Sequence, residues 1–157
     1  MARVQTVKKA RKARKEYGIK KGDTYYWWKF RFGAIHYSKT YPKRSQLTQS
    51  GFLSTFYELQ DNLSFDRDGL EGSVQNLTDE IGQLRDECQD SLDNMPEHLQ
   101  DTSFSGELLT ERIEALEEWI NELEGIDLEV DEDLSEEEKE TRIDEIVDEL
   151  EACECSL

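Results

Sequence analysis

The sequence predicts an α+β protein that is mainly α, with a small N-terminal β-hairpin followed by an acidic, antiparallel helical bundle. Three observations lead to this prediction. Aromatic and β-branched residues flank Gly33, which is typical of a hairpin. Apolar residues recur at heptad spacing from Leu70, which is typical of coiled-coil helices. The charge also changes sign: residues 1–45 hold 14 Lys/Arg and two Asp/Glu, whereas residues 46–157 hold five Lys/Arg and 35 Asp/Glu.

The composition fits an elongated helical protein better than a compact globule. The chain has 157 residues, of which 36% are hydrophobic and 36% are charged, and this apolar content is low for a compact fold. No apolar run approaches the roughly 18 residues of a membrane span, and the basic N-terminus lacks the apolar core of a secretory signal. The odd number of cysteines, three, is typical of reduced thiols. We therefore expect a cytoplasmic protein with no membrane partner.

Changes in composition divide the chain into four predicted segments. They are a basic flexible arm at 1–22, an aromatic and basic ββα head at 23–66, a coiled-coil helical hairpin at 67–125, and an acidic linker with a C-terminal helix at 126–157. The arm has many charges and few large apolar groups, which is typical of a segment that stays mobile until a partner neutralises it. Its candidate phosphate-binding residues are Lys8, Lys9, Arg11, Lys12, Arg14 and Lys15.

Residues 24–42 predict a β-hairpin with a type II′ turn at Gly33-Ala34. The register set by this turn puts Tyr26, Trp28, Phe30, Phe32, Tyr37 and Lys39 on a core-facing side. The other face then shows Trp27, Lys29, Arg31, His36, Ser38 and Thr40. Cations and hydroxyls beside an exposed indole are typical of surfaces that contact phosphates and stack on bases. We also expect a third strand from residues 17–22, and a covering helix from the apolar stripe that starts at Phe52.

The heptad pattern predicts two long helices. Their seam residues are Leu70, Val74, Leu77, Ile81, Leu84 and Cys88 in the first, and Leu109, Ile113, Leu116, Ile120 and Leu123 in the second. Trp119 lies beside the second seam, and Pro96 ends the first helix. Two apolar seams joined by a short connection predict an antiparallel helical hairpin.

A third, shorter helix is predicted near the C-terminus. Ser135 and Glu138 match a capping box, so the helix should run from about Ser135 to Glu151. Its apolar stripe consists of Ile143, Ile146, Val147 and Leu150. The stripe either completes a three-helix bundle or is covered by a second chain, and we expect a homodimer.

The sequence carries none of the strong catalytic or phosphate-loop motifs, so we expect neither an enzyme nor a cofactor. His36 and His98 have no neighbouring ligands at metal-site spacing. Cys88, Cys153 and Cys155 are scattered over a helical seam and a tail, so no metal site is expected.

The residues TYYWWKFRFGAIHYSKTYPKRSQ, followed by a helix, resemble the small arm-type DNA-binding domain at the N-terminus of tyrosine recombinases. The resemblance implies that the sheet enters the DNA major groove. It implies that Trp27, Lys29, Arg31, Ser38 and Lys39 lie on or near the DNA-facing side, although the register above puts Lys39 on the other face. No recombinase catalytic domain follows, so recombination is not implied. The whole chain also resembles the short acidic proteins encoded by bacteriophages, which implies the host cytoplasm as its location.

The segregation of charge favours a nucleic-acid-binding adaptor. In this hypothesis the arm and hairpin contact the phosphates of DNA or RNA, and the acidic helices self-associate or recruit a protein. The alternative is a phage-type inhibitor whose acidic helical body mimics nucleic acid or blocks a host protein. A ribosome- or RNA-associated factor would share the same head chemistry.

Overall fold

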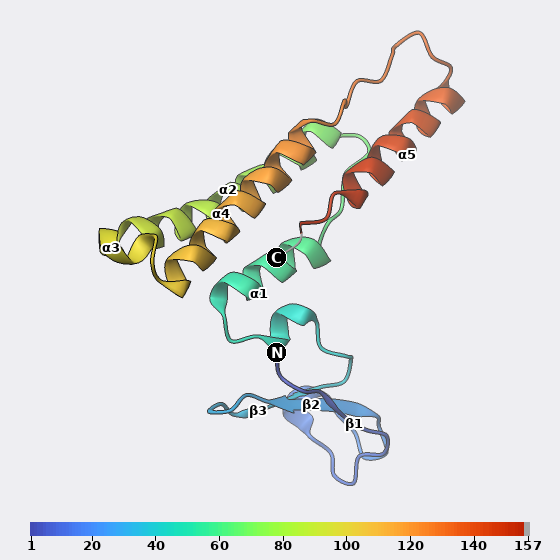
Figure 1. Ribbon diagram of the computed structural model, residues 1–157. Coiled ribbons are helices and arrows are strands. Elements are labelled where there is room, and N and C mark those ends of the chain that lie inside the picture. Colours follow the sequence, from blue (N-terminus) through green and yellow to red (C-terminus); the bar gives the residue numbers. More distant parts are fainter. Residues whose placement is uncertain (156–157) are drawn as a thin grey trace. The chain divides into compact units, whose positions relative to one another are not determined.

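The computed structural model describes residues 1–155, and the chain divides into two compact units, Met1–Asp61 and Asn62–Leu157 (Figure 1). The first unit contains an antiparallel three-stranded sheet and ends with helix α1 (Gly51–Asp61), whereas the head was predicted to extend to residue 66. The second unit is built from helices. This arrangement confirms the predicted α+β, mainly α fold class. Each helix that the structure describes is too short or too polar to cross a membrane.

The sheet has the strand order β1-β2-β3. Its strands are β1 (Gln5–Val7), β2 (Tyr25–Lys29) and β3 (Ile35–Ser38), and both neighbouring pairs are antiparallel. The third strand therefore comes from the start of the chain, and its predicted origin in residues 17–22 is wrong. Pairing with β1 satisfies the backbone groups on the second edge of β2.

Residues 8–22, predicted to belong to a mobile arm, form a loop that returns to the start of β2. The backbone amide of Ala10 donates to the carbonyl of Asp23 at 2.8 Å. Ala10 and Ile19 are buried, with 2% and 1% of their surface exposed. Gly18 has a φ of 65°, in the left-handed region that glycine adopts without steric cost, and this allows the chain to turn back. The basic segment is thus part of the folded head.

The pairing of β2 with β3 differs from the predicted register by three residues. Trp28 pairs with His36, and the strands are connected by a five-residue loop, 30–34, instead of a two-residue turn. Gly33 lacks the positive φ that a type II′ turn requires at that position. One face of the sheet holds Thr6, Tyr26, Trp28, His36 and Ser38, and the other holds Gln5, Val7, Tyr25, Trp27, Lys29, Ile35 and Tyr37. An odd shift moves every β3 side chain to the opposite face.

The side of the sheet that carries Trp28 packs against the segment that follows β3. The Trp28 ring is 4% exposed, stacks on His36 with centroids 5.3 Å apart, and donates its indole N–H to the carbonyl of Gln46 at 3.1 Å. Gln46 belongs to the short 3₁₀ helix η2 (Arg44–Leu47), which contacts α1. Of the five aromatic residues predicted for the core, Trp28 alone is buried in the structure, and Phe32 is exposed at the loop.

Helices α2 (Leu70–Asp93) and α4 (Phe104–Glu124) lie side by side and run antiparallel, with the short helix α3 (Glu97–Gln100) between them in the chain (Figure 1). This confirms the predicted helical hairpin. Its buried seam residues are Leu70, Val74, Thr78, Ile81, Leu84 and Cys88 in α2, and Gly106, Ile113, Leu116, Trp119 and Leu123 in α4. Thr78 and Trp119 are more buried than the predicted seam residues Leu77 and Ile120, because a helix of 3.6 residues per turn drifts from a heptad repeat.

Helix α5 (Glu136–Ala152) begins with the predicted capping box. The Ser135 hydroxyl accepts from the backbone amide of Glu138, and the Glu138 carboxylate accepts from the Ser135 amide at 3.0 Å. In the apolar stripe, Ile146 and Leu150 are fully buried within the single chain. The stripe therefore no longer argues for a dimer. The end of the predicted C-terminal segment, residues 156–157, lies outside the described residues.

Two glycines of the helical hairpin should respond to the same substitution with opposite signs. A Cβ at Gly106 would lie 2.0 Å from the carbonyl oxygen of Gln100, so we expect Gly106→Ala to lower the free energy of unfolding by about 1–3 kcal/mol. A Cβ at Gly82 in α2 would meet no atom within 4 Å, so Gly82→Ala should raise it by about 0.5–1 kcal/mol. Urea unfolding followed by circular dichroism measures both changes. A stabilising effect of Gly106→Ala would contradict the close approach of α4 to Gln100.

Candidate nucleic-acid interface

The first unit concentrates the positive charge of the protein. Residues 1–61 hold 14 of the 19 Lys and Arg residues but only four of the 37 Asp and Glu residues, a net charge of +10. The predicted phosphate-binding residues of the 8–22 loop are all exposed: Lys8, Lys9, Arg11, Lys12, Arg14 and Lys15. Exposed cations at this density attract polyanions and gain binding free energy by releasing counterions from phosphates.

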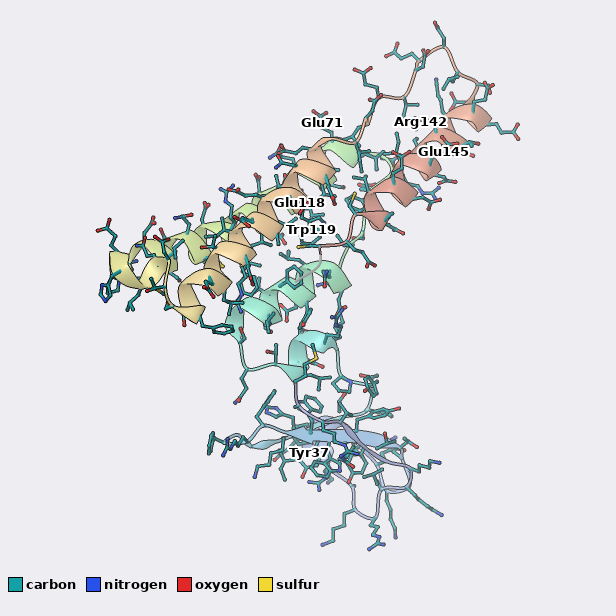
Figure 2. All side chains as sticks on the ribbon, in the orientation of Figure 1. Tyr37, Glu71, Glu118, Trp119, Arg142 and Glu145 are labelled. Atoms are coloured by element: carbon teal, nitrogen blue, oxygen red, sulfur yellow. The ribbon has the colours of Figure 1, made fainter. Side chains whose placement is uncertain are left out.

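Aromatic contacts hold the loop against the Trp27 face of the sheet. The Arg14 guanidinium lies 3.8 Å from the centroid of the Tyr37 ring, and the Tyr17 ring packs on Tyr37 with centroids 5.2 Å apart. Tyr17 ends the short 3₁₀ helix η1 (Lys15–Tyr17), and Figure 2 shows Tyr37 on the side of the sheet where this loop lies. Arg14 therefore stabilises the loop by a cation–π contact. The other predicted loop cations remain exposed around it.

Asp23 restrains the end of the loop and neutralises part of the charge beside it. Its carboxylate accepts from the backbone amide of Lys20 at 3.0 Å and pairs with the Lys39 ammonium at 3.6 Å. The hydrogen bond from Lys20, assisted by the charge of Lys39, lowers the pKa of Asp23 and keeps it ionised. The predicted contact of Lys39 with a phosphate would therefore compete with this ion pair.

The predicted surface residues of the hairpin divide between two faces. Trp27 and Lys29 share one face, as predicted, with Trp27 half-buried and Lys29 exposed. Ser38 lies on the opposite face, where its hydroxyl is hydrogen-bonded to the hydroxyl of Thr40 at 3.3 Å. Arg31 is exposed in the loop between β2 and β3. The predicted grouping of Ser38 with Trp27 and Lys29 is wrong, because the register differs by an odd number of residues.

Two further residues have the chemistry of nucleic-acid contacts. Phe32, assigned to the core from sequence, is 89% exposed, and the Arg31 guanidinium lies 5.2 Å from its ring centroid. An exposed ring beside a cation is suited to stacking on a base. The sequence signal for the exposure of Phe32 was its position next to Gly33, at the connection between the two strands. Arg3 lines a hollow together with Lys29 and Arg31, a grouping with no signal in the sequence because it depends on how distant segments meet.

The three cysteines are free thiols in the second unit. Cys153 and Cys155 follow α5 and contact α4: the Trp119 indole N–H donates to the Cys153 carbonyl at 2.9 Å, and the Cys155 thiol donates to the Ala115 carbonyl at 3.4 Å. Within residues 1–155, no three His, Cys, Asp or Glu side chains are grouped to hold a metal ion. The geometry of Cys153 and Cys155 indicates a packing role.

The Cys155 thiol should react slowly in the folded protein. Burial, together with the charges of Glu118 and Glu122, raises its pKa to about 11 from a usual value of 9.0. About one thiol in a thousand is then ionised at pH 8. The contribution of this thiol to stability is fully present below pH 9 and is lost as the pH rises towards 11, because the unfolded chain loses the proton first. Thiol labelling at pH 8 with and without urea, analysed by peptide mass spectrometry, tests this expectation. Equal rates of Cys155 labelling with and without urea would contradict the expected slow reaction in the folded protein.

Comparisons with protein-family models, with curated proteins and with solved structures found no match. The resemblances to the tyrosine recombinase arm-type domain and to acidic phage proteins therefore stay predictions.

Proposed function

We propose that the protein is a nucleic-acid-binding adaptor whose first unit binds DNA or RNA through phosphate groups. The observation that supports this most is the net charge of +10 on residues 1–61, carried largely by exposed side chains on a loop that is packed on a sheet. Residues 62–157 hold five Lys/Arg and 33 Asp/Glu, a net charge of −28, which repels nucleic acid. Binding is therefore confined to the head.

The head offers two kinds of contact. The loop supplies exposed cations for phosphates, which position a nucleic acid without reading its sequence. The rings of Trp27 and Phe32, beside Lys29 and Arg31, supply surfaces on which bases could stack. The loop is ordered by Arg14, so less conformational entropy is lost on binding than from a mobile arm.

The helical unit is proposed to contact a protein. Leu99 in α3 and Phe104 at the start of α4 are 38% and 78% exposed, which places two large apolar side chains at the same end of the hairpin. Such exposed apolar groups on an otherwise acidic surface suit a protein contact, either with a partner or with a second copy.

The charge of the helical unit favours a second candidate function. A surface with 33 carboxylates against five cations presents negative charge in the manner of a nucleic acid. In this alternative the helical unit is a phage-type inhibitor that occupies the nucleic-acid site of another protein. The basic head would then dock on an acidic protein surface.

Direct binding measurements test the proposed function. Fluorescence anisotropy with labelled DNA and RNA, single- and double-stranded, should report binding by the full chain that weakens steeply as salt rises. Binding that is absent at low salt, or that does not respond to salt, would contradict a phosphate-directed head.

A pull-down from lysate with and without nuclease separates the two candidate functions. The adaptor should retain nucleic acid and lose the proteins bridged by it after nuclease treatment. The inhibitor should retain the same protein in both samples, because its partner contacts the acidic helices directly.

A further inference from the structure

A hollow at one edge of the head gathers three cations from three parts of the chain. It has a volume of about 340 Å³, and its charged lining residues are Arg3 before β1, Lys29 at the end of β2 and Arg31 in the following loop. Thr48 and Gln49, which precede α1, supply polar side chains to the same hollow. Every one of these groups is able to donate a hydrogen bond to an anion.

The hollow lies within the first unit, and hydrogen bonds between distant segments fix its walls. The backbone amide of Ala2 donates to the carbonyl of Leu47 at 2.7 Å, which holds the residues before β1 against the segment that leads into α1. The indole of Trp28 donates to the carbonyl of Gln46 at 3.1 Å and holds the same segment against β2. The antiparallel pairing of β1 with β2, in which Gln5 faces Trp27, brings Arg3 towards Lys29 when its register is continued by two residues.

The charge of the hollow is uncompensated in the structure. Its lining contains no Asp or Glu, and none of the ion pairs within residues 1–155 involves Arg3, Lys29 or Arg31. Cations that line one hollow without a counter-ion repel one another, and a bound anion lowers that repulsion. The Asp23 carboxylate of the same unit is paired with Lys39.

We propose that this hollow is a binding site for one phosphate group. The identity of the ligand rests on the proposed function: the hollow then holds a phosphate of the bound nucleic acid. Two guanidinium groups present paired N–H donors that match phosphate oxygens, and the Lys29 ammonium adds a point charge. The Thr48 hydroxyl accepts from the backbone amide of Ser50 at 3.1 Å, which leaves its own hydrogen to donate. The site is distinct from the 8–22 loop, so it provides a fixed second point of attachment.

Inorganic phosphate is the first probe. Full-length, ¹⁵N-labelled protein titrated with phosphate at constant ionic strength should show saturable chemical-shift changes at the amides of Arg3, Arg31 and Gln49. Arg3→Gln should weaken phosphate binding by about tenfold or more, because it removes a charge-assisted hydrogen bond. Arg11→Gln removes the same charge from the 8–22 loop and should change the affinity less than twofold. Equal losses in the two variants, or shifts that centre on the loop, would overturn the proposal.

Oligonucleotides then identify the source of the phosphate. If the hollow holds a terminal phosphate, a 5′-phosphorylated strand binds more tightly than the same strand with a 5′-hydroxyl, and Arg3→Gln removes that advantage. If it holds an internal phosphodiester, both strands bind equally and Arg3→Gln weakens both. If the protein binds oligonucleotides tightly and Arg3→Gln leaves that affinity unchanged, the proposed phosphate site in the hollow is overturned but the proposed function is not. Specific phosphate binding in the hollow without any oligonucleotide binding supports the anion site and overturns the proposed function.

Discussion

Trp119→Ala should lower the free energy of unfolding of the helical unit by about 3–5 kcal/mol. Trp119 lies in α4 with 1% of its surface exposed, and Figure 2 labels it beside Glu118 on that helix. Its indole donates to the Cys153 carbonyl at 2.9 Å, so the substitution removes buried apolar area together with the hydrogen bond that attaches the residues after α5. Urea unfolding followed by far-ultraviolet circular dichroism, which reports mainly on the helices, measures the loss.

Two further variants separate the causes of that loss. Trp119→Phe keeps most of the apolar volume but leaves the Cys153 carbonyl without its indole donor, so it should cost about 1–3 kcal/mol. Phe104→Ala changes an aromatic residue of the same helix that is 78% exposed, and its effect should stay within about 0.5 kcal/mol. An effect of Trp119→Ala as small as that of Phe104→Ala would show that Trp119 is not in the core.

The helical half of the fold could be predicted because its signals are local. The heptad spacing, the helix-ending Pro96 and the capping box of Ser135 and Glu138 each act within a few residues of the chain. The antiparallel pairing of α2 with α4 follows from the short connection between these two helices. The exact seam was less predictable, since the choice of Trp119 over Ile120 depends on how the helix drifts relative to its neighbour.

The sheet could be predicted only in part, because its register depends on contacts between distant residues. The sequence around Gly33 favours a tight turn, yet the structure has a five-residue loop there. Stacking of Arg14 on Tyr37 on one face, and the hydrogen bond from Trp28 to Gln46 on the other, are consistent only with the observed pairing. Tertiary packing overrides a local turn preference in such a case.

In the candidate interface, too, the local features could be predicted from the sequence and the contacts between distant residues could not. The density of charge in residues 8–15 is visible in the sequence, but its attachment to the sheet is not, because nothing near Arg14 in the chain indicates Tyr37 as its partner. Ser38 was grouped with Lys29 by a turn that does not form. Arg3 could not be grouped with Lys29 at all, since the hollow is made by segments that meet only in the folded head.

Replacing four loop cations with glutamine should nearly abolish nucleic-acid binding at moderate salt. The variant carries Lys8→Gln, Lys9→Gln, Arg11→Gln and Lys12→Gln, and it spares Arg14 because that residue holds the loop on Tyr37. If each replaced side chain neutralises one phosphate of duplex DNA, the slope of log K against log salt should decrease in magnitude by about 3.6, and the affinity at 0.1 M salt should fall on the order of a thousandfold. Fluorescence anisotropy at several salt concentrations measures both quantities.

A control variant separates a local contact from a change in net charge. Arg67, Arg85, Lys139 and Arg142 of the helical unit each form an ion pair at the surface, and replacing them with glutamine changes the net charge by the same four units. Surface ion pairs contribute little to stability, so this control should remain folded. It should bind nucleic acid nearly as well as the unmodified protein, because its lost charges lie outside the head. Similar losses of affinity in the two variants would show that net charge governs binding, and the loop would then have no special place in the interface.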